Sequence, residues 1–260
     1  MHRLTLTLDT PAENLALDEA LLDEATLDVP TRDQAEAAGP AAEFLRIWES
    51  PQPIVVLGRS SRVDEEIDAA ACARRSIPIL RRTSGGAAIV AGPGCLMYAV
   101  VLSYDRRPEA RGIHQSHRYV LDRLADSLQP YAPGVVRAGT SDLVLLGGSE
   151  VGTARKFSGN SLRVTRTHFL YHGTLLYDFD LPLITTCLRT APRQPEYRCA
   201  REHGEFVANL PVGREPLEAA LKAAWPSAGE LNDWPRARVA ELVRERYRRD
   251  EWNLAYGRNA

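Results

Sequence analysis

Apolar and polar positions along the chain change repeatedly between strand-like and helix-like periodicity. Residues 2–8 alternate as a β-strand does, whereas residues 14–25 place Leu17, Leu21 and Leu22 on one side of a helix. The same patterns predict strands over 44–48, 54–57, 77–80 and 95–103, helices over 64–75 and 114–128, and mainly strands from 135 to 177.

The remaining segments complete a single-domain organisation. Residues 31–42 are rich in Ala, Glu, Gln and Pro and predict a loop, and Gly147-Gly148 predicts a hairpin turn. After Asp180 the pattern is helical with proline interruptions, and 236–249 predicts a charged terminal helix. Because the chain has neither an internal repeat nor a break in composition, we expect residues 1–260 to form one α/β (α+β) domain. Its sheet should be mixed, largely antiparallel and flanked by helices.

Composition excludes several classes of function. The chain has 260 residues, 44% of them hydrophobic, and a net charge of −2, which gives no broad electrostatic attraction to nucleic acid or an anionic membrane. No run of eighteen apolar residues occurs, and the N-terminus lacks the apolar stretch of a signal peptide. The four cysteines form no CxxC pair. We therefore expect a reduced, cytoplasmic protein with no nucleic-acid or membrane partner.

Lys156 is one of two lysines in a chain with thirty arginines, and it lies in the segment Arg155-Lys156-Phe157-Ser158-Gly159-Asn160-Ser161. A lysine presents a compact ammonium with three donors, whereas an arginine presents a wide planar fork. The composition of the segment predicts a Gly/Ser turn. A lysine there is either a solvated turn residue or a catalytic group that stays bound to one oxygen while the charge on that oxygen changes during a reaction.

Three other features carry candidate chemistry. The segment Arg81-Arg82-Thr83-Ser84-Gly85-Gly86-Ala87-Ala88-Ile89 contains neither a P-loop nor a GxGxxG motif. Its small residues allow backbone N–H groups to approach an anion, with the two arginines beside it, but a tight turn with surface arginines fits equally well. Asp142 precedes an apolar run, either as a turn residue or pointing into a site, and Tyr171-His172-Gly173-Thr174-Leu175-Leu176 follows downstream.

Taken together, these segments resemble the lipoate–protein ligase family, within the group that includes biotin ligases and octanoyl transferases. Residues 14–16 and 139–143 also have counterparts, and the resemblance runs from about residue 10 to 180 in consistent order. It implies a biotin/lipoate ligase-like catalytic domain that activates lipoate with ATP and Mg²⁺ to lipoyl-AMP. The lipoyl group would then pass to a lysine of a lipoyl carrier domain, from a 2-oxoacid dehydrogenase acyltransferase subunit or a glycine-cleavage H protein.

The resemblance also implies roles for individual residues. Lys156 would be the catalytic residue, facing the carboxylate and the α-phosphate. Asp142 would contact Mg²⁺ or the nucleoside, and His172 would support the acyl pocket. The adenylate would be bound by Arg82, Ser84, Gly85, Gly86, Ala87 and Gly159. More loosely, Trp48, Leu57 and Gly58 would help form the acyl tunnel, and Arg155, Arg163 and Arg166 would dock an acidic carrier domain.

The chain departs from the family pattern at four positions and at its C-terminus. Ala87 replaces a glycine, Ala91 a histidine, and Cys95 and Ser141 each an asparagine, so both ATP use and acyl specificity are open. The C-terminal accessory domain of many such ligases is expected to be absent, because 247–253 resembles only its beginning. A separate chain would supply that domain, or the protein would perform only the transfer step.

Two other functions stay open. An ATP-independent octanoyl or lipoyl transferase would use a cysteine acyl-enzyme, for which Cys95, Cys187 and Cys199 are the candidates. A non-catalytic protein that binds lipoyl domains would need no Lys156. A biotin ligase is disfavoured, because a GRGR-type loop does not occur.

Overall fold

The main element of the fold is a seven-stranded sheet with strand order β1-β2-β6-β10-β9-β8-β7. The computed structural model describes residues 1–27, 42–147, 154–190 and 194–255. All neighbouring strands of this sheet are antiparallel except β1 and β2, which are parallel. Its strands are β1 (His2–Thr5), β2 (Phe44–Glu49), β6 (Cys95–Ser103), β7 (Val135–Ala138), β8 (Asp142–Leu145), β9 (Arg155–Val164) and β10 (His168–Leu176).

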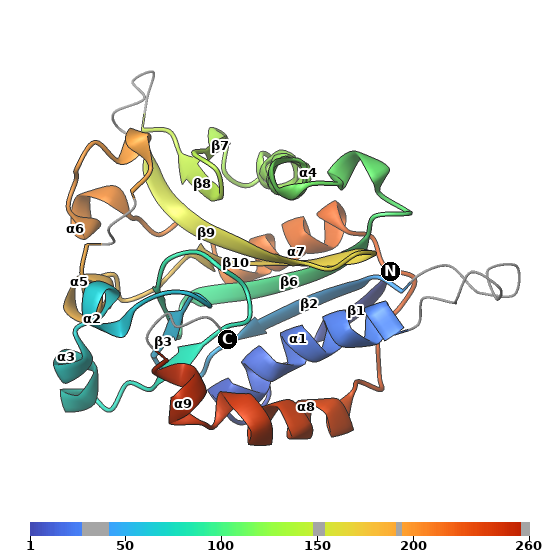
Figure 1. The fold of residues 1–260 in the computed structure, drawn as a ribbon. Coiled ribbons are helices and arrows are strands. Elements are labelled where there is room, and N and C mark those ends of the chain that lie inside the picture. The colour runs from blue at the N-terminus through green and yellow to red at the C-terminus, as the bar shows by residue number, and fades with distance from the viewer. Residues whose placement is uncertain (28–41, 148–153, 191–193, 256–260) are drawn as a thin grey trace, which may run out of the picture.

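A smaller sheet of order β4-β3-β5 lies beside the larger one (Figure 1). Its central strand β3 (Ile54–Leu57) pairs in parallel with β4 (Ile79–Arg81) and antiparallel with β5 (Ile89–Ala91). The glycine-containing segment connects β4 to β5. That connection places it at the end of the small sheet that faces β9 and β10.

Helices cover both faces of the seven-stranded sheet (Figure 1). Helix α1 (Pro11–Leu27) and α8 (Arg236–Leu242) pack on one face, and α4 (Ile113–Leu128) and α7 (Arg214–Ala224) on the other. The shorter helical elements are α2 (Val63–Glu66), α3 (Ala69–Arg74), η2 (Pro108–Ala110), α5 (Pro182–Cys187), η4 (Glu196–Arg198), α6 (His203–Phe206), η5 (Val243–Tyr247) and α9 (Asp250–Asn253). Within the described ranges, no helix is long and apolar enough to cross a membrane.

Strand β6 lies near the middle of the sheet and separates two hydrophobic cores. All nine of its residues are buried, and successive side chains of a strand point to opposite faces. Met97 and Ala99 therefore pack in the core beneath α1, while Leu96 and Tyr98 pack in the core beneath α4 and α7. The prediction of a mixed, largely antiparallel sheet flanked by helices is confirmed.

Two local predictions are wrong. The Lys156 segment is not a turn: it is the beginning of β9, and its glycine and serines form part of the sheet. The helix expected over 64–75 is divided, because Ile67 forms a β-bridge with Leu188 and the Asp68 carboxylate caps a new helix by accepting the amide of Ala71. The loop expected over 31–42, apart from its last residue, and half of the expected 147–148 turn lie outside the described residues.

Candidate active site

Lys156 forms an ion pair with Asp142 on the neighbouring strand. Its Nζ lies 2.8 Å from Asp142 Oδ1, with 27% of the lysine side chain exposed and only 7% of the aspartate. The Tyr197 hydroxyl donates to the other carboxylate oxygen over 2.6 Å. Burial and the adjacent Asp142 charge both raise the pKa of Tyr197, so this hydroxyl remains a donor at neutral pH. Asp142 therefore holds the ammonium at one place.

The backbone of β8 and β9 aims these two side chains. The strand pairing contains a bulge between Leu143 and Val144, and bulges of this kind redirect neighbouring side chains. The Lys156 side chain folds back across Gly159, where an added Cβ would lie 3.0 Å from both Cε and Nζ. Gly159 thus provides the space in which the lysine side chain lies.

Arg81 and Arg82 are buried and use their donors within the protein. The Arg81 guanidinium donates to backbone carbonyls from residues 58–61 and from the C-terminal segment, including Ser61, Trp252 and Ala255. The Arg82 guanidinium donates to the Ser84 hydroxyl and to carbonyls of Val56, Gly85 and Ala87. Both arginines shape the wall of the site, and neither is a free cation for a phosphate.

Two glycines bring the wall together. Gly86 has a φ of +85°, a conformation that side chains disfavour. A Cβ on Gly58 would lie 1.8 Å from the Gly86 carbonyl oxygen. The 58–61 turn can therefore approach the glycine segment this closely only because residue 58 has no side chain. The Ser61 hydroxyl donates to the same carbonyl over 3.1 Å. Ala87 is not among the residues with positive φ, so its methyl group fits without backbone strain.

Two adjoining cavities meet at Lys156. The larger, of about 390 Å³, lies between the glycine segment, β9, β10 and α1, and the smaller, of about 150 Å³, extends towards α5 and α6. Residues lining both are Ala87, Ala88, Ile89, Lys156, Gly159, Thr174 and Pro195. Lys156 therefore lies beside the point at which a ligand that fills both cavities would pass from one to the other.

The larger cavity gathers seven of the nine residues proposed from sequence. They are Arg82, Gly86, Ala87, Asp142, Lys156, Gly159 and His172. Ser84 and Gly85 lie behind this wall: Ser84 is 1% exposed and hydrogen-bonds to His172, and the Gly85 carbonyl accepts from Ser161. The looser tunnel assignments, Trp48, Leu57 and Gly58, line neither cavity.

Sequence reasoning missed the apolar end of the larger cavity and a polar support. Leu15, Val56 and Met97 line the end away from Asp142, and Val56 is the direct neighbour of the proposed Leu57. Asn160 accepts from Tyr98 over 2.6 Å and donates to the Ser141 carbonyl over 2.9 Å, which fixes the backbone immediately before Asp142. Strands β3 and β6 are buried along their whole length, so the sequence contains no polar alternation that would have singled out Val56 and Met97.

Two of the arginines proposed for carrier docking are anchored internally. Arg155 donates to the carbonyls of Gly204 and Val207, and Arg163 pairs with the buried Glu19 at 2.5 Å. The Arg163 charge is thereby paired, whereas Arg155 is exposed and keeps its charge, because its partners are neutral carbonyls.

None of the four cysteines lines either cavity. Cys72, Cys95 and Cys187 are buried, and Cys199 is exposed. Burial raises the pKa of Cys72 to about 12 and also raises the pKa of Cys95 and Cys187. Buried thiols of this kind are protonated and unreactive at neutral pH.

The described residues contain no cluster of three or more His, Cys, Asp or Glu side chains that could hold a metal ion. Among the residues lining the larger cavity, Asp142 is the one carboxylate. Mg²⁺ in nucleotide sites is commonly bound by one or two carboxylates together with phosphate oxygens. Asp142 fits that role only through lone pairs left free by Lys156 and Tyr197.

The sequence matches the family described as "Lipoyl protein ligase A/B catalytic domain" over residues 10–218, which is most of the chain and includes every residue of the two cavities. The chain belongs to this family. The family resemblance of the three sequence segments is thereby confirmed.

Relatives within the family differ in activity. The chain is 24% identical to lipoate–protein ligase 1 of Staphylococcus aureus over 96% of this chain and 71% of the relative. It is 25% identical to octanoyltransferase LipM of Kyrpidia tusciae over 93% of this chain and 94% of the relative. The protein is therefore an enzyme of the ligase and transferase family, and these similar identities do not distinguish between the two reactions.

Solved structures show the same fold. A bi-partite lipoate protein ligase from Thermoplasma acidophilum, studied with its E2 lipoyl domain, aligns with a TM-score of 0.79 at 21% identity over 100% of this chain and 98% of that chain. A lipoate-protein ligase A bound with ATP aligns with a TM-score of 0.76 at 21% identity over 98% of each chain.

Proposed function

We propose that the protein is an ATP-dependent lipoate–protein ligase. The observation that carries the proposal is the position of the Lys156 ammonium at the junction of two cavities that no cysteine lines. An acyl-adenylate has one acyl and one nucleotide part joined at a mixed anhydride. A fixed cation at that junction stabilises the charge that develops there in both half-reactions.

The acyl chain is assigned to the larger cavity. Its apolar end is formed by Leu15, Val56 and Met97, and the polar end by Asp142 and Lys156. The smaller cavity is lined mainly by apolar side chains, with Arg189, Arg198 and His203 among its polar residues, and is assigned to the nucleoside. Mg²⁺ would arrive with the phosphates of ATP and face Asp142.

The reaction then proceeds in two steps. A carboxylate oxygen of lipoate attacks the α-phosphorus of ATP, and the bond to the leaving pyrophosphate breaks. The neutral amine of the acceptor lysine next attacks the acyl carbon, AMP leaves with the bonding electron pair, and the nitrogen loses a proton. Lys156 donates hydrogen bonds to the oxygens that gain charge and needs no covalent role.

The acceptor is proposed to be a lipoyl carrier domain, of a 2-oxoacid dehydrogenase acyltransferase subunit or a glycine-cleavage H protein. The archaeal structural neighbour is described with its E2 lipoyl domain, and it is bi-partite. By that similarity, the protein would act together with a second, separate chain. We propose residues 1–260 as the catalytic unit of such a pair.

The test is ATP–pyrophosphate exchange by the purified protein with lipoate, octanoate or no acid. Exchange that depends on an added acid, and that is lost in Lys156→Ala, would support the ligase. Absence of exchange alone would also fit a ligase that lacks its second chain. The transferase related to LipM is identified instead by a hydroxylamine-sensitive acyl-enzyme formed with octanoyl carrier protein and by loss of activity when one cysteine is replaced by serine.

A further inference from the structure

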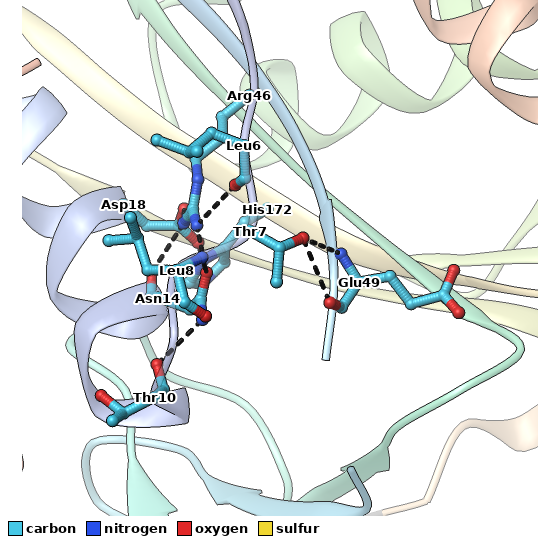
Figure 2. A network of polar contacts seen from close by, with 9 residues as sticks. All are labelled: Leu6, Thr7, Leu8, Thr10, Asn14, Asp18, Arg46, Glu49 and His172. Carbon is cyan, nitrogen blue, oxygen red and sulfur yellow. Dashed lines mark hydrogen bonds and ion pairs between the residues drawn. The ribbon is translucent and has the colours of Figure 1, made fainter. Parts of the chain in front are cut away.

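A buried chain of polar contacts connects α1 to the glycine segment through His172. Arg46 is fully buried, and its Nη1 donates to Asp18 Oδ1 over 2.6 Å. The other oxygen of Asp18 lies 3.4 Å from His172 Nδ1, and His172 Nε2 lies 2.5 Å from Ser84 Oγ. Figure 2 shows the Arg46 guanidinium enclosed by Leu6, Asn14 and Asp18, with His172 beside them.

The donors in this chain fix the position of each proton. Arg82 Nε can only donate, and it donates to Ser84 Oγ over 3.0 Å. Ser84 Oγ keeps a second lone pair and one proton, so this contact alone lets His172 Nε2 either accept or donate. The Asp18 carboxylate, paired with Arg46, can only accept, and it faces Nδ1. A neutral imidazole that donates at Nδ1 has an unprotonated Nε2, which then accepts the Ser84 proton. Every contact is then a donor paired with an acceptor.

Asp18 cannot turn away from this arrangement. Its side chain is 4% exposed, and Arg46 is itself held by the carbonyls of Leu6 and Asn14 and by the Asn14 side chain. Asn14 is held in turn by the backbone of Leu8 and Thr10 (Figure 2). The first turns of α1 therefore form a rigid support behind His172.

A serine, a histidine and an aspartate in this order also describe the triad of a hydrolase. The structure does not fit that role, because Ser84 is 1% exposed and lines neither cavity. Its hydroxyl connects two walls of the site. Gly86, Ala87 and the His172 ring form the cavity surface in front of it.

We propose that Asp18 is a positioning residue of the active site. It holds His172 in the Nδ1–H tautomer, and His172 in turn holds Ser84 and the glycine segment opposite Lys156. The effect on turnover rests on the proposed acyl-transfer function, whereas the tautomer does not. An experiment can therefore reject the acyl-transfer function without rejecting the tautomer, and the reverse.

Asp18→Asn tests the inference. Arg46 can only donate, so the new amide oxygen faces Arg46 and the amide NH₂ faces His172 Nδ1. The ring must then accept at Nδ1 and carry its proton on Nε2, so Ser84 Oγ would accept from both Arg82 and His172 and its own proton would have to turn away from the ring. ¹⁵N NMR of the imidazole nitrogens, assigned with His172→Gln, should show Nδ1–H in the native protein and Nε2–H in the variant. We expect kcat to fall on the order of 10²-fold while KM for the acid changes little.

Glu43→Gln is the matched control. Glu43 is also a buried carboxylate paired with an arginine, Arg107, but it lines neither cavity. Its loss should lower stability and leave the His172 tautomer and kcat unchanged. An Nε2–H tautomer in the native protein would overturn the inference whether or not Asp18→Asn folds, and so would an Asp18→Asn protein with native kcat. The expected tautomer change in a protein with no acyl-transfer activity would support the inference and reject the proposed function.

Discussion

The Lys156 ammonium lies 2.8 Å from the Asp142 carboxylate, and the two residues come from adjacent antiparallel strands. This pairing places a cation against the boundary of two cavities and prevents the long lysine side chain from exploring solvent. A substrate that brings phosphate and carboxylate oxygens to this point replaces solvent around an ammonium already in place. Such preorganisation is how a fixed charge accelerates a reaction.

Lys156→Ala should therefore reduce acyl transfer by roughly 10²- to 10³-fold without unfolding the protein. Lys156→Arg should not restore activity, because a planar fork cannot occupy the place of a compact ammonium over Gly159. The matched control is Lys222→Ala, which removes the other lysine, a partly buried residue paired with Glu218 and remote from both cavities. Single-turnover transfer to a lipoyl domain would measure all three. Equal rates for Lys156→Ala and Lys222→Ala would contradict the assigned role.

Gly159→Ala offers a finer test of the same geometry. The added methyl group would lie 3.0 Å from the end of the Lys156 side chain, which can move at little cost to folding. We expect a near-native melting temperature together with a loss of kcat on the order of 10²-fold, since the ammonium would be displaced from the junction. At Gly213 a Cβ would meet nothing within 4 Å, so Gly213→Ala should leave kcat unchanged. A fully active Gly159→Ala enzyme would show that the observed lysine position is not the catalytic one.

The sequence predicted the fold class, and seven of the nine residues proposed from it line the larger cavity, because they lie in short segments of distinctive composition. It did not predict features that depend on contacts with residues far away along the chain, such as the direction of a side chain or the extent of a strand. Nothing in Arg81-Arg82 indicates that both guanidinium groups point inwards to carbonyls. A serine- and glycine-rich segment predicts a turn, yet strands on both sides recruit residues 155–164 into the sheet.

The proposed acyl pocket shows a second kind of limit. The sequence suggested Leu57 for it, whereas its neighbour Val56 lines the larger cavity, and in a strand one residue reverses the face. Both are buried apolar residues in β3, so composition could not separate them. Only the position of the neighbouring sheet shows which face borders the cavity.

Arg81 connects the C-terminal segment to the site, which gives a prediction about stability. Its three guanidinium nitrogens make five hydrogen bonds to carbonyls on both sides, and Asn253 accepts its backbone N–H over 3.0 Å. Arg81→Lys leaves several buried carbonyls without a donor and should cost about 3 kcal/mol of unfolding free energy. Arg62→Lys, at an exposed pair with Asp64, should change stability by less than about 0.5 kcal/mol. Urea unfolding of both variants measures the difference, and similar midpoints would contradict the role of Arg81.

Glu19 predicts how stability depends on pH. Burial alone would raise its pKa, but the Tyr247 hydroxyl and the charges of Arg246 and Arg163 lower it below 4.5. A carboxyl with a lowered pKa in the folded state stabilises the protein above its unfolded pKa and loses that contribution as pH falls through the folded value. The stability difference between the native protein and Glu19→Gln should therefore be constant near neutral pH and shrink below about pH 4.5. A difference that stays constant into the acid range would show that Glu19 is not charged in the folded protein.

Met97 is expected to limit the length of the acyl chain. In the sheet register it lies between Trp48 of β2 and Thr174 of β10, so the three side chains form a row on one face. Thr174 and Met97 line the larger cavity, whereas Trp48 does not, which makes the Met97 thioether the boundary of the cavity on that side.

Met97→Ala should open this end of the cavity and raise kcat/KM for a ten-carbon acid relative to an eight-carbon acid by roughly tenfold. The reason is that each methylene in an apolar pocket contributes about 1 kcal/mol or more. Leu96→Ala removes a similar volume from the opposite core and should lower stability without changing this ratio. If Met97→Ala and Leu96→Ala showed the same ratio of kcat/KM for the two acids, the acyl chain would not end at Met97. The proposal that the larger cavity binds the acid would then be wrong.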